Sequence, residues 1–402
     1  MKKIILLAIA ASLALSACSG SDKNTQNAVQ TPPPAQAGPK LSEAEQLLQS
    51  IKFTNDGIKK LFKSETEMTP VEYEAYLLSY QKCKLEDGKF NSDKCPPASI
   101  SYEVSKLNLD QEEKNKVALK LLKSKHESVR LAAARDIKAH PNDTDFHKKV
   151  FELAKKEKSV YVLSNMTQGF GFSVPKDEEM LNFIKEHAGD ENVRMREVVA
   201  GYLSDNDVIA QHPEVYETLL NMCTKDASTS VSFYACQGVG KTHDEGVIPT
   251  LAEVLNDPEQ FARHDHITRA LVEMWLDFPH YEYTSKDAYT AYMNYLKKKP
   301  RTDTVPASES LRINQLVDTG DEYKKWQKEA KYFKLKDMIS VYSDIAKDDN
   351  AGIYARKVAV EMINDWGTAK DLKALSKPIQ SSKADRIEEL QELLNQCIEN
   401  KK

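Results

Sequence analysis

The chain has 402 residues, with 56 Lys and Arg against 61 Asp and Glu, which gives a formal net charge of −5. This mildly acidic balance gives no electrostatic basis for binding nucleic acid, which would need a basic face. Glycine is scarce at 14 residues, and apolar residues recur at helical spacing while few stretches alternate as strands do, so an all-α fold is expected.

Residues 1–17 read as a targeting segment. Lys2 and Lys3 precede an apolar run over residues 4–15, which is too short to cross a bilayer, and Leu15-Ser16-Ala17-Cys18 follows. This order closely resembles the signal peptide and lipobox of bacterial lipoproteins. The resemblance implies that Cys18 becomes the first residue of the mature chain and carries acyl chains such as palmitate, which anchor it in a membrane. Ser19 stands where an inner-membrane retention signal would have Asp, so the expected site is the outer membrane, facing the periplasm. The alternative is an ordinary secretory peptide cut near Ala17.

The next segment, residues 18–40, is expected to be a disordered tether behind the lipid. It is rich in Ser, Asn, Gln, Ala and Pro and has almost no large apolar residue, so it cannot contribute to a core. Its role would be to hold the folded part of the chain at a distance from the membrane.

Residues 41–105 predict an N-terminal helical segment. One helix should follow Ser42, and a second should begin at Thr69-Pro70 and carry Tyr73, Tyr76, Leu77 and Tyr80. Cys83 and Cys95 then bracket a polar loop. In an oxidising periplasm they should form a disulfide, with two unpaired thiols as the alternative.

Residues 106–402 predict successive helix pairs separated by Pro, Gly, Asn and Asp at the turns. Among them are a helix over 309–317 and one long helix over 325–346. The valines of similar segments, Val129, Val160, Val193 and Val231, lie 31, 33 and 38 residues apart. Such spacing is typical of an α-solenoid of stacked antiparallel helix pairs.

The segment Ser128-Val129-Arg130-Leu131-Ala132-Ala133-Ala134 resembles the second helix of a HEAT repeat, and Asn192-Val193-Arg194-Met195 is similar. The resemblance covers about residues 105–400, is strongest over 120–260, and becomes irregular after about residue 260. It implies a HEAT-like, armadillo-like solenoid, and a family whose members mostly bind proteins, although fold does not fix function.

No motif for catalysis, a metal or a cofactor stands out. His243, His264, His266 and His280 fall in one stretch, but Arg263-His264-Asp265-His266 is expected to be solvated loop and N-cap before a helix from Ile267. Gly169-Phe170-Gly171-Phe172 and Gly238-Val239-Gly240-Lys241-Thr242 lack the rest of a phosphate loop and are expected to be helix C-terminal breaks.

The roles of three arginines and three cysteines stay open between two interpretations. Arg130, Arg194 and Arg356 occupy similar repeat positions, where they could face a partner or pair with carboxylates at a neighbouring turn. Cys223 and Cys236 flank the turn of one helix pair and could form a disulfide, but a buried free thiol at Cys236 is an equally good alternative. Cys397 has no obvious partner in the sequence.

The expected function is that of a lipid-anchored scaffold, not an enzyme, which binds another envelope protein through the second helices of its pairs. The alternative is an enzyme, or a protein that binds a small ligand or a metal near His243 to His280, with a pocket enclosed by the solenoid.

Overall fold

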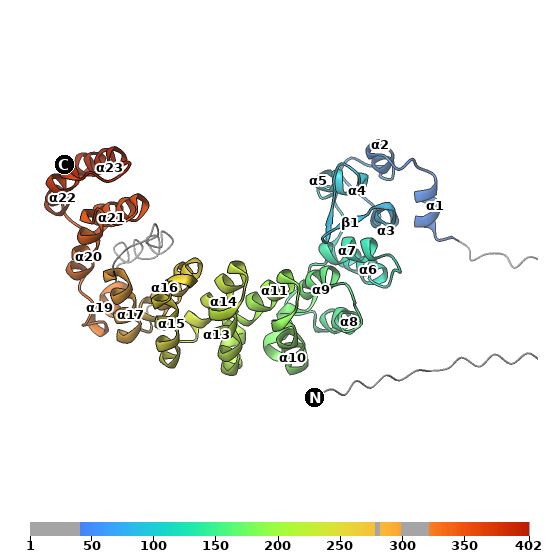
Figure 1. The fold of residues 1–402 in the computed structure, drawn as a ribbon. Coiled ribbons are helices and arrows are strands. Elements are labelled where there is room, and N and C mark those ends of the chain that lie inside the picture. The colour runs from blue at the N-terminus through green and yellow to red at the C-terminus, as the bar shows by residue number, and fades with distance from the viewer. Residues whose placement is uncertain (1–40, 278–281, 299–320, 402) are drawn as a thin grey trace, which may run out of the picture. The chain divides into compact units, whose positions relative to one another are not determined.

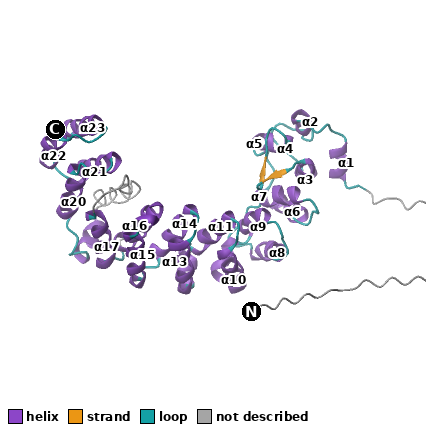
Figure 2. Cartoon of the chain, viewed as in Figure 1, coloured by secondary structure: helices purple, strands orange, loops and turns teal. Residues whose placement is uncertain are grey.

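A computed structural model describes residues 41–277, 282–298 and 321–401. This part of the chain is all-α; its only strands are two short pieces of one hairpin (Figure 2). None of its helices is both long and apolar enough to span a membrane. Cys18, the signal segment, the tether, His280 and the helix expected over 309–317 all lie outside the described residues.

The N-terminal helical segment contains short helices and the hairpin (Figure 1). In chain order its elements are α1 Glu43–Gln49, α2 Asn55–Lys59, α3 Pro70–Ser79, the 3-10 turn η1 Tyr80–Lys82, β1 Leu85–Glu86, β2 Lys89–Phe90, α4 Pro96–Ser99 and α5 Ser101–Val104. The strands pair antiparallel, with Leu85 opposite Phe90.

The remaining chain consists mostly of helices that follow one another in pairs (Figure 1). The pairs are α6 Gln111–Leu121 with α7 Glu127–Asp136, α8 Thr144–Ala154 with α9 Val160–Met166, α10 Glu178–Glu186 with α11 Val193–Leu203, α13 Tyr216–Lys225 with α14 Thr229–Lys241, α15 Ile248–Asn256 with α16 Phe261–Leu276, α20 Leu335–Lys347 with α21 Ile353–Trp366, and α22 Ala369–Ser381 with α23 Ile387–Asn400. Among the described residues, three helices stand outside these pairs: α12 Asn206–Gln211, α17 Lys286–Lys297 and α19 Asp321–Glu329. Short 3-10 turns connect many of these helices: η2 Thr167–Gly169, η3 Gly171–Lys176, η4 His187–Gly189, η5 Pro213–Val215, η6 Glu245–Val247 and η7 Pro258–Gln260.

Local signals account for where many of these helices begin. Thr69 caps α3 in a capping box with Glu72, and Pro70 occupies the first turn, where its missing N–H costs nothing. Asp143 and Asp177 accept from the backbone N–H groups of Phe146 and Met180 at the starts of α8 and α10.

Contacts run between neighbouring pairs. Most second helices pack against the second helix of the next pair, as in α7 with α9, α9 with α11, α11 with α14, α14 with α16 and α21 with α23. The small side chains Ala132, Ala133, Ala134, Ala200 and Ala235 are buried in these helices, where they let backbones approach closely. Across the expected boundary at residues 105–106, α3 packs against α6 and α7.

Three local expectations were wrong. The long helix over 325–346 is broken between α19 and α20, where Phe333 turns inward to stack on Trp275 at 5.4 Å between ring centroids. Helix α16 begins at Phe261, so the segment from Arg263 to His266 is helical and is neither loop nor N-cap.

The third concerns the glycines near residue 240. Gly238 and Gly240 lie inside the last turns of α14 and do not end it at Val239. A Cβ atom added at Gly238 would lie 2.4 Å from Ser204 Oγ, and one at Gly240 would lie 2.7 Å from Glu273 Cβ. The glycines are therefore needed for close packing of α14 against its neighbours.

Candidate functional site

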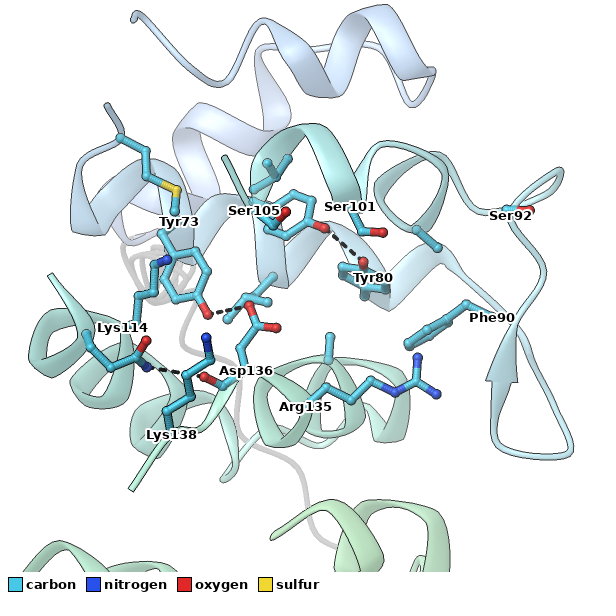
Figure 3. Close-up of a pocket in the computed structure, with 17 residues that line it drawn as sticks. Tyr73, Tyr80, Phe90, Ser92, Ser101, Ser105, Lys114, Arg135, Asp136 and Lys138 are labelled. Carbon is cyan, nitrogen blue, oxygen red and sulfur yellow. Dashed lines mark hydrogen bonds between the residues drawn. The ribbon is translucent and has the colours of Figure 1, made fainter. Parts of the chain in front are cut away.

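A cavity of about 460 Å³ lies in the N-terminal helical segment, where α3, α5 and the hairpin meet α6 and α7 (Figure 3). We call it the tyrosine cavity. Its lining residues are Met68, Tyr73, Tyr76, Leu77, Tyr80, Phe90, Ser92, Ala98, Ser101, Val104, Ser105, Gln111, Lys114, Ala132, Arg135, Asp136 and Lys138.

The three tyrosines share one face of α3 and its continuation into η1. Tyr73, Tyr76 and Tyr80 are three and four residues apart, which places their side chains along one stripe of a helix. The rings of Tyr76 and Tyr80 meet edge to face at 5.6 Å between centroids. All three residues are buried, so this stripe forms one wall of the cavity.

The hairpin closes a second side. A disulfide joins Cys83 to Cys95, with a Cα–Cα distance of 5.2 Å, and holds the two ends of the hairpin together. Its turn residues Asp87 and Gly88 have φ of 48° and 68°, the left-handed geometry that two-residue hairpins favour. The hairpin places the Phe90 ring 4.6 Å from the Tyr80 ring.

Arg135, at the end of α7, links this hairpin to the helix pairs. Its Nη2 atom donates to Gly88 O at 2.9 Å, and its guanidinium lies 5.1 Å from the centre of the Phe90 ring. Partial burial lowers the pKa of Arg135 below its usual value, and the nearby Arg194 charge lowers it further, but a guanidinium stays charged.

The tyrosine hydroxyls are bonded within the protein. Tyr76 Oη donates to Pro97 O at 3.0 Å, so the 3.0 Å contact between the Tyr76 and Tyr80 hydroxyls has Tyr80 as its donor. Burial raises the pKa of Tyr76, and burial raises the pKa of Tyr80 to about 12. Both hydroxyls therefore stay protonated at neutral pH.

Asp136 is the one carboxylate of the lining. Tyr73 Oη donates to Asp136 Oδ2 at 2.7 Å, and Gln111 Nε2 donates to the backbone carbonyl of the same residue at 3.4 Å. Burial raises the pKa of Asp136, although the Tyr73 hydrogen bond and the charges of Lys114, Lys138 and Arg135 oppose the rise. In Figure 3, Lys114 and Lys138 lie near the hydrogen-bonded Tyr73 and Asp136 side chains.

The structure places the three arginines singled out from the sequence in three different settings. Arg130 binds Glu157, in the turn between α8 and α9 of the next pair, through Nε to Oε2 at 2.7 Å and Nη2 to Oε1 at 2.9 Å. Arg356 is 1% exposed and binds Ala346 O and Asp349. Arg194 is exposed, and no carboxylate pairs with it in the described parts of the chain.

The structural counterpart of Arg130 is Arg196, which the sequence pattern missed. Its Nε and Nη2 atoms bind Asp226 at 2.7 and 3.0 Å, and Nη1 donates to Asp190 O at 2.7 Å. Arg130 likewise donates from Nη1 to Ser124 O, six residues before it. The motif Val-Arg places Arg194 two residues too early on the helix to reach the next turn, so the equivalence of Arg130 with Arg194 was wrong.

The cysteines and histidines have mainly structural contacts. A disulfide joins Cys223 to Cys236 between α13 and α14, and Cys397 is a buried free thiol. His264 is buried and its Nε2 atom bonds to the carbonyls of Val254 and Asp257, while His243 stacks on Tyr283 and lies 3.3 Å from Asp277. In the described ranges, no group of three or more His, Cys, Asp or Glu side chains is arranged to hold a metal.

The second helices also expose large side chains. Val193 on α11 and Tyr234 on α14 are each 42% exposed, and Tyr354 on α21 is 56% exposed. These three are half of the exposed large hydrophobic residues of the described chain; Leu41, Tyr102 and Phe172 lie elsewhere. Tyrosine is enriched at protein–protein interfaces.

Sequence reasoning placed the tyrosine stripe on a helix but did not combine it with the charged residues of the cavity. Lys114, Arg135, Asp136 and Lys138 lie on or just after α6 and α7, far from α3 in the chain. The one feature of the sequence that could have indicated this site is the pair Arg135-Asp136 at the end of α7, where two charged residues directly follow three buried alanines. No protein-family model matches the chain, and a search of curated proteins finds no match.

Proposed function

We propose that this protein is a helical-repeat scaffold, held at the bacterial outer membrane by lipid on Cys18, that binds another envelope protein through its second helices. In this proposal the helix pairs stack as a HEAT-like α-solenoid, and residues 18–40 tether it. The chain would act by binding and not by turnover.

The pattern of contacts between pairs supports the stacking. The Arg130–Glu157 and Arg196–Asp226 ion pairs each join one pair to the turn of the next, and each carboxylate also accepts from backbone N–H groups there. Ser159 donates to Glu127, and Ser230 to Glu197, in the same way. Repeated contacts between neighbouring units are what a one-dimensional array requires.

The observation that carries the binding proposal is the exposure of Tyr234 and Tyr354 on second helices. The side chains that join neighbouring pairs are bonded within the protein and are not available to a partner: Arg130, Arg196, Ser159 and Ser230. The two tyrosines and Arg194 remain exposed. Tyr and Arg dominate the binding energy of many interfaces because they combine a large rigid surface with a polar group.

The lipid anchor rests on the lipobox-like sequence around Cys18. A chain with Cys18→Ser should lose incorporation of labelled palmitate and leave the membrane fraction, while Cys397→Ser should retain both. Equal palmitate incorporation in the two variants would contradict the anchor.

Photo-cross-linking in cells tests the binding surface. Two variants carry a benzophenone amino acid, one in place of Tyr234 and one in place of Tyr354. Each variant should give one major adduct, and the cross-linked envelope protein should be the same in both. The same amino acid at Asn221 on α13 or Lys336 on α20, exposed positions on the first helices of the same pairs, should not. Adducts of equal yield from first and second helices, or none from the tyrosines, would contradict the proposal.

A further inference from the structure

The lining of the tyrosine cavity carries an excess of positive charge. Lys114, Arg135 and Lys138 face one carboxylate, Asp136, and that carboxylate accepts a hydrogen bond from Tyr73. Within the described residues, none of the three cations forms an ion pair with a carboxylate within 4.0 Å.

Other lysines of α6 differ in this respect. Lys116 pairs with Glu112 at 3.0 Å and Glu113 at 2.8 Å, and Lys120 pairs with Glu74 at 2.6 Å. The lysines on the outer surface of this helix therefore have carboxylate partners, whereas Lys114 has none among the described residues. Lys114 is half-buried, and Arg135 and Lys138 are exposed. Unbalanced cations gathered beside a cavity attract an anion.

The rest of the lining combines apolar and aromatic side chains with the polar groups of Ser92, Ser101, Ser105 and Gln111. Met68, Leu77 and Val104 are buried, and the hydroxyls of Tyr73, Tyr76 and Tyr80 are already bonded to Asp136, Pro97 O and one another. The tyrosines therefore contribute mainly ring surface. A cavity volume of about 460 Å³ lies within the range of small-molecule sites.

We propose that the tyrosine cavity binds a small organic monocarboxylate, whose aromatic or branched aliphatic body packs on the tyrosine rings while its carboxylate lies beside Lys114 and Lys138. Arg135 is already bound to Gly88 O, so Lys114 and Lys138 against Asp136 leave one positive charge for the ligand, which a monocarboxylate balances. This site is separate from the second-helix tyrosines, so it can exist whether or not the scaffold proposal holds.

Calorimetry on the full-length chain in detergent tests the proposal with 3-phenylpropionate and 4-methylpentanoate, against the neutral amide of each acid and against inorganic phosphate. At least one acid should bind, and about tenfold or more tighter than its amide, since hydrogen bonds between charged groups are stronger than those to a neutral amide. Binding of neither acid, equal binding of acid and amide, or tighter binding of phosphate would overturn it.

Variants locate the site. Lys114→Gln with Lys138→Gln should weaken the acid about tenfold or more, and Lys116→Gln, two residues from Lys114 on the outer surface of α6, should leave it unchanged. Ser101→Trp should abolish binding by filling the cavity from an exposed lining position without changing any charge. Circular dichroism melts show that each variant is folded. Equal weakening by Lys116→Gln, or full binding by folded Ser101→Trp, would overturn the location.

Discussion

The guanidinium of Arg196 fixes two turns at once. It holds Asp190 O, in the turn before its own helix, and Asp226, in the turn before α14. The side chains of Arg196 and Asp226 are only 13% and 7% exposed, so the ion pair is shielded from solvent far more than a surface pair would be. The same geometry at Arg130 makes this a repeated connection between pairs.

Removing this guanidinium should therefore destabilise the protein. Arg196→Met leaves the shielded Asp226 carboxylate without its main partner, and we expect the free energy of unfolding to fall by about 2 kcal/mol. Arg194→Met is the matched control, because its exposed guanidinium has no carboxylate partner among the described residues; its effect should stay within about 0.5 kcal/mol. Urea unfolding followed by circular dichroism measures both. Equal losses in the free energy of unfolding would show that Arg196 contributes no more to stability than Arg194.

The corresponding carboxylates should make stability depend on pH. Burial alone would raise the pKa of Glu157, but its hydrogen bonds from Arg130 and from backbone N–H groups outweigh burial and hold it below 4.5. A depressed folded pKa gives stability that is present above pH about 4.5 and lost as the pH falls through the folded value. The destabilisation caused by Glu157→Gln should thus shrink with acidification. Unfolding at pH 7 and pH 3.5 tests this, and a constant difference would contradict it.

At the scale of elements, the turn of the hairpin depends on Gly88. Its φ is 68°, and a Cβ atom there would lie 2.1 Å from Cδ1 of the Tyr161 ring. Gly88→Ala should destabilise the protein by at least about 1–2 kcal/mol, because a side chain disfavours this conformation and the Tyr161 ring would also have to move.

Gly201, in α11, provides the control for this substitution. A Cβ atom there would meet no atom of the described residues within 4 Å, so Gly201→Ala should stabilise the helix by about 0.5–1 kcal/mol. Thermal melts of the two variants should shift in opposite directions. A neutral Gly88→Ala melt would show that the hairpin turn tolerates other geometries.

Helices were more predictable than strands or the cavity. Periodic apolar residues and signals such as Thr69-Pro70 are local, so the sequence places most helices to within a few residues. The strands have two residues each, too few to show alternation, and only the disulfide and the Asp87-Gly88 turn define the hairpin. The cavity joins Tyr73 to Asp136, 63 residues apart, a contact that depends on how α3 packs against α7.

At the scale of the whole molecule, the main contacts stay between neighbours along the chain. The four C-terminal helices α20 to α23 pack mainly against one another, and α17 provides the main contact with the chain before them, including the Tyr292–Tyr342 hydroxyl contact at 3.1 Å. In a stacked array, stability is close to a sum of units and their interfaces, without one shared core.

A chain that ends at Lys334 tests this property. Deleting α20–α23 should leave amide exchange protection in α6–α14 unchanged and lower it in α17, which loses its neighbour. Hydrogen exchange with mass spectrometry on the truncated and full chains measures this helix by helix. Deleting residues 213–242 instead removes an internal pair together with the Arg196–Asp226 connection and should lower protection on both sides of the gap. A loss of protection throughout α6–α14 in the chain that ends at Lys334 would mean that the helices share a single cooperative core, and the stacked-array proposal would fail.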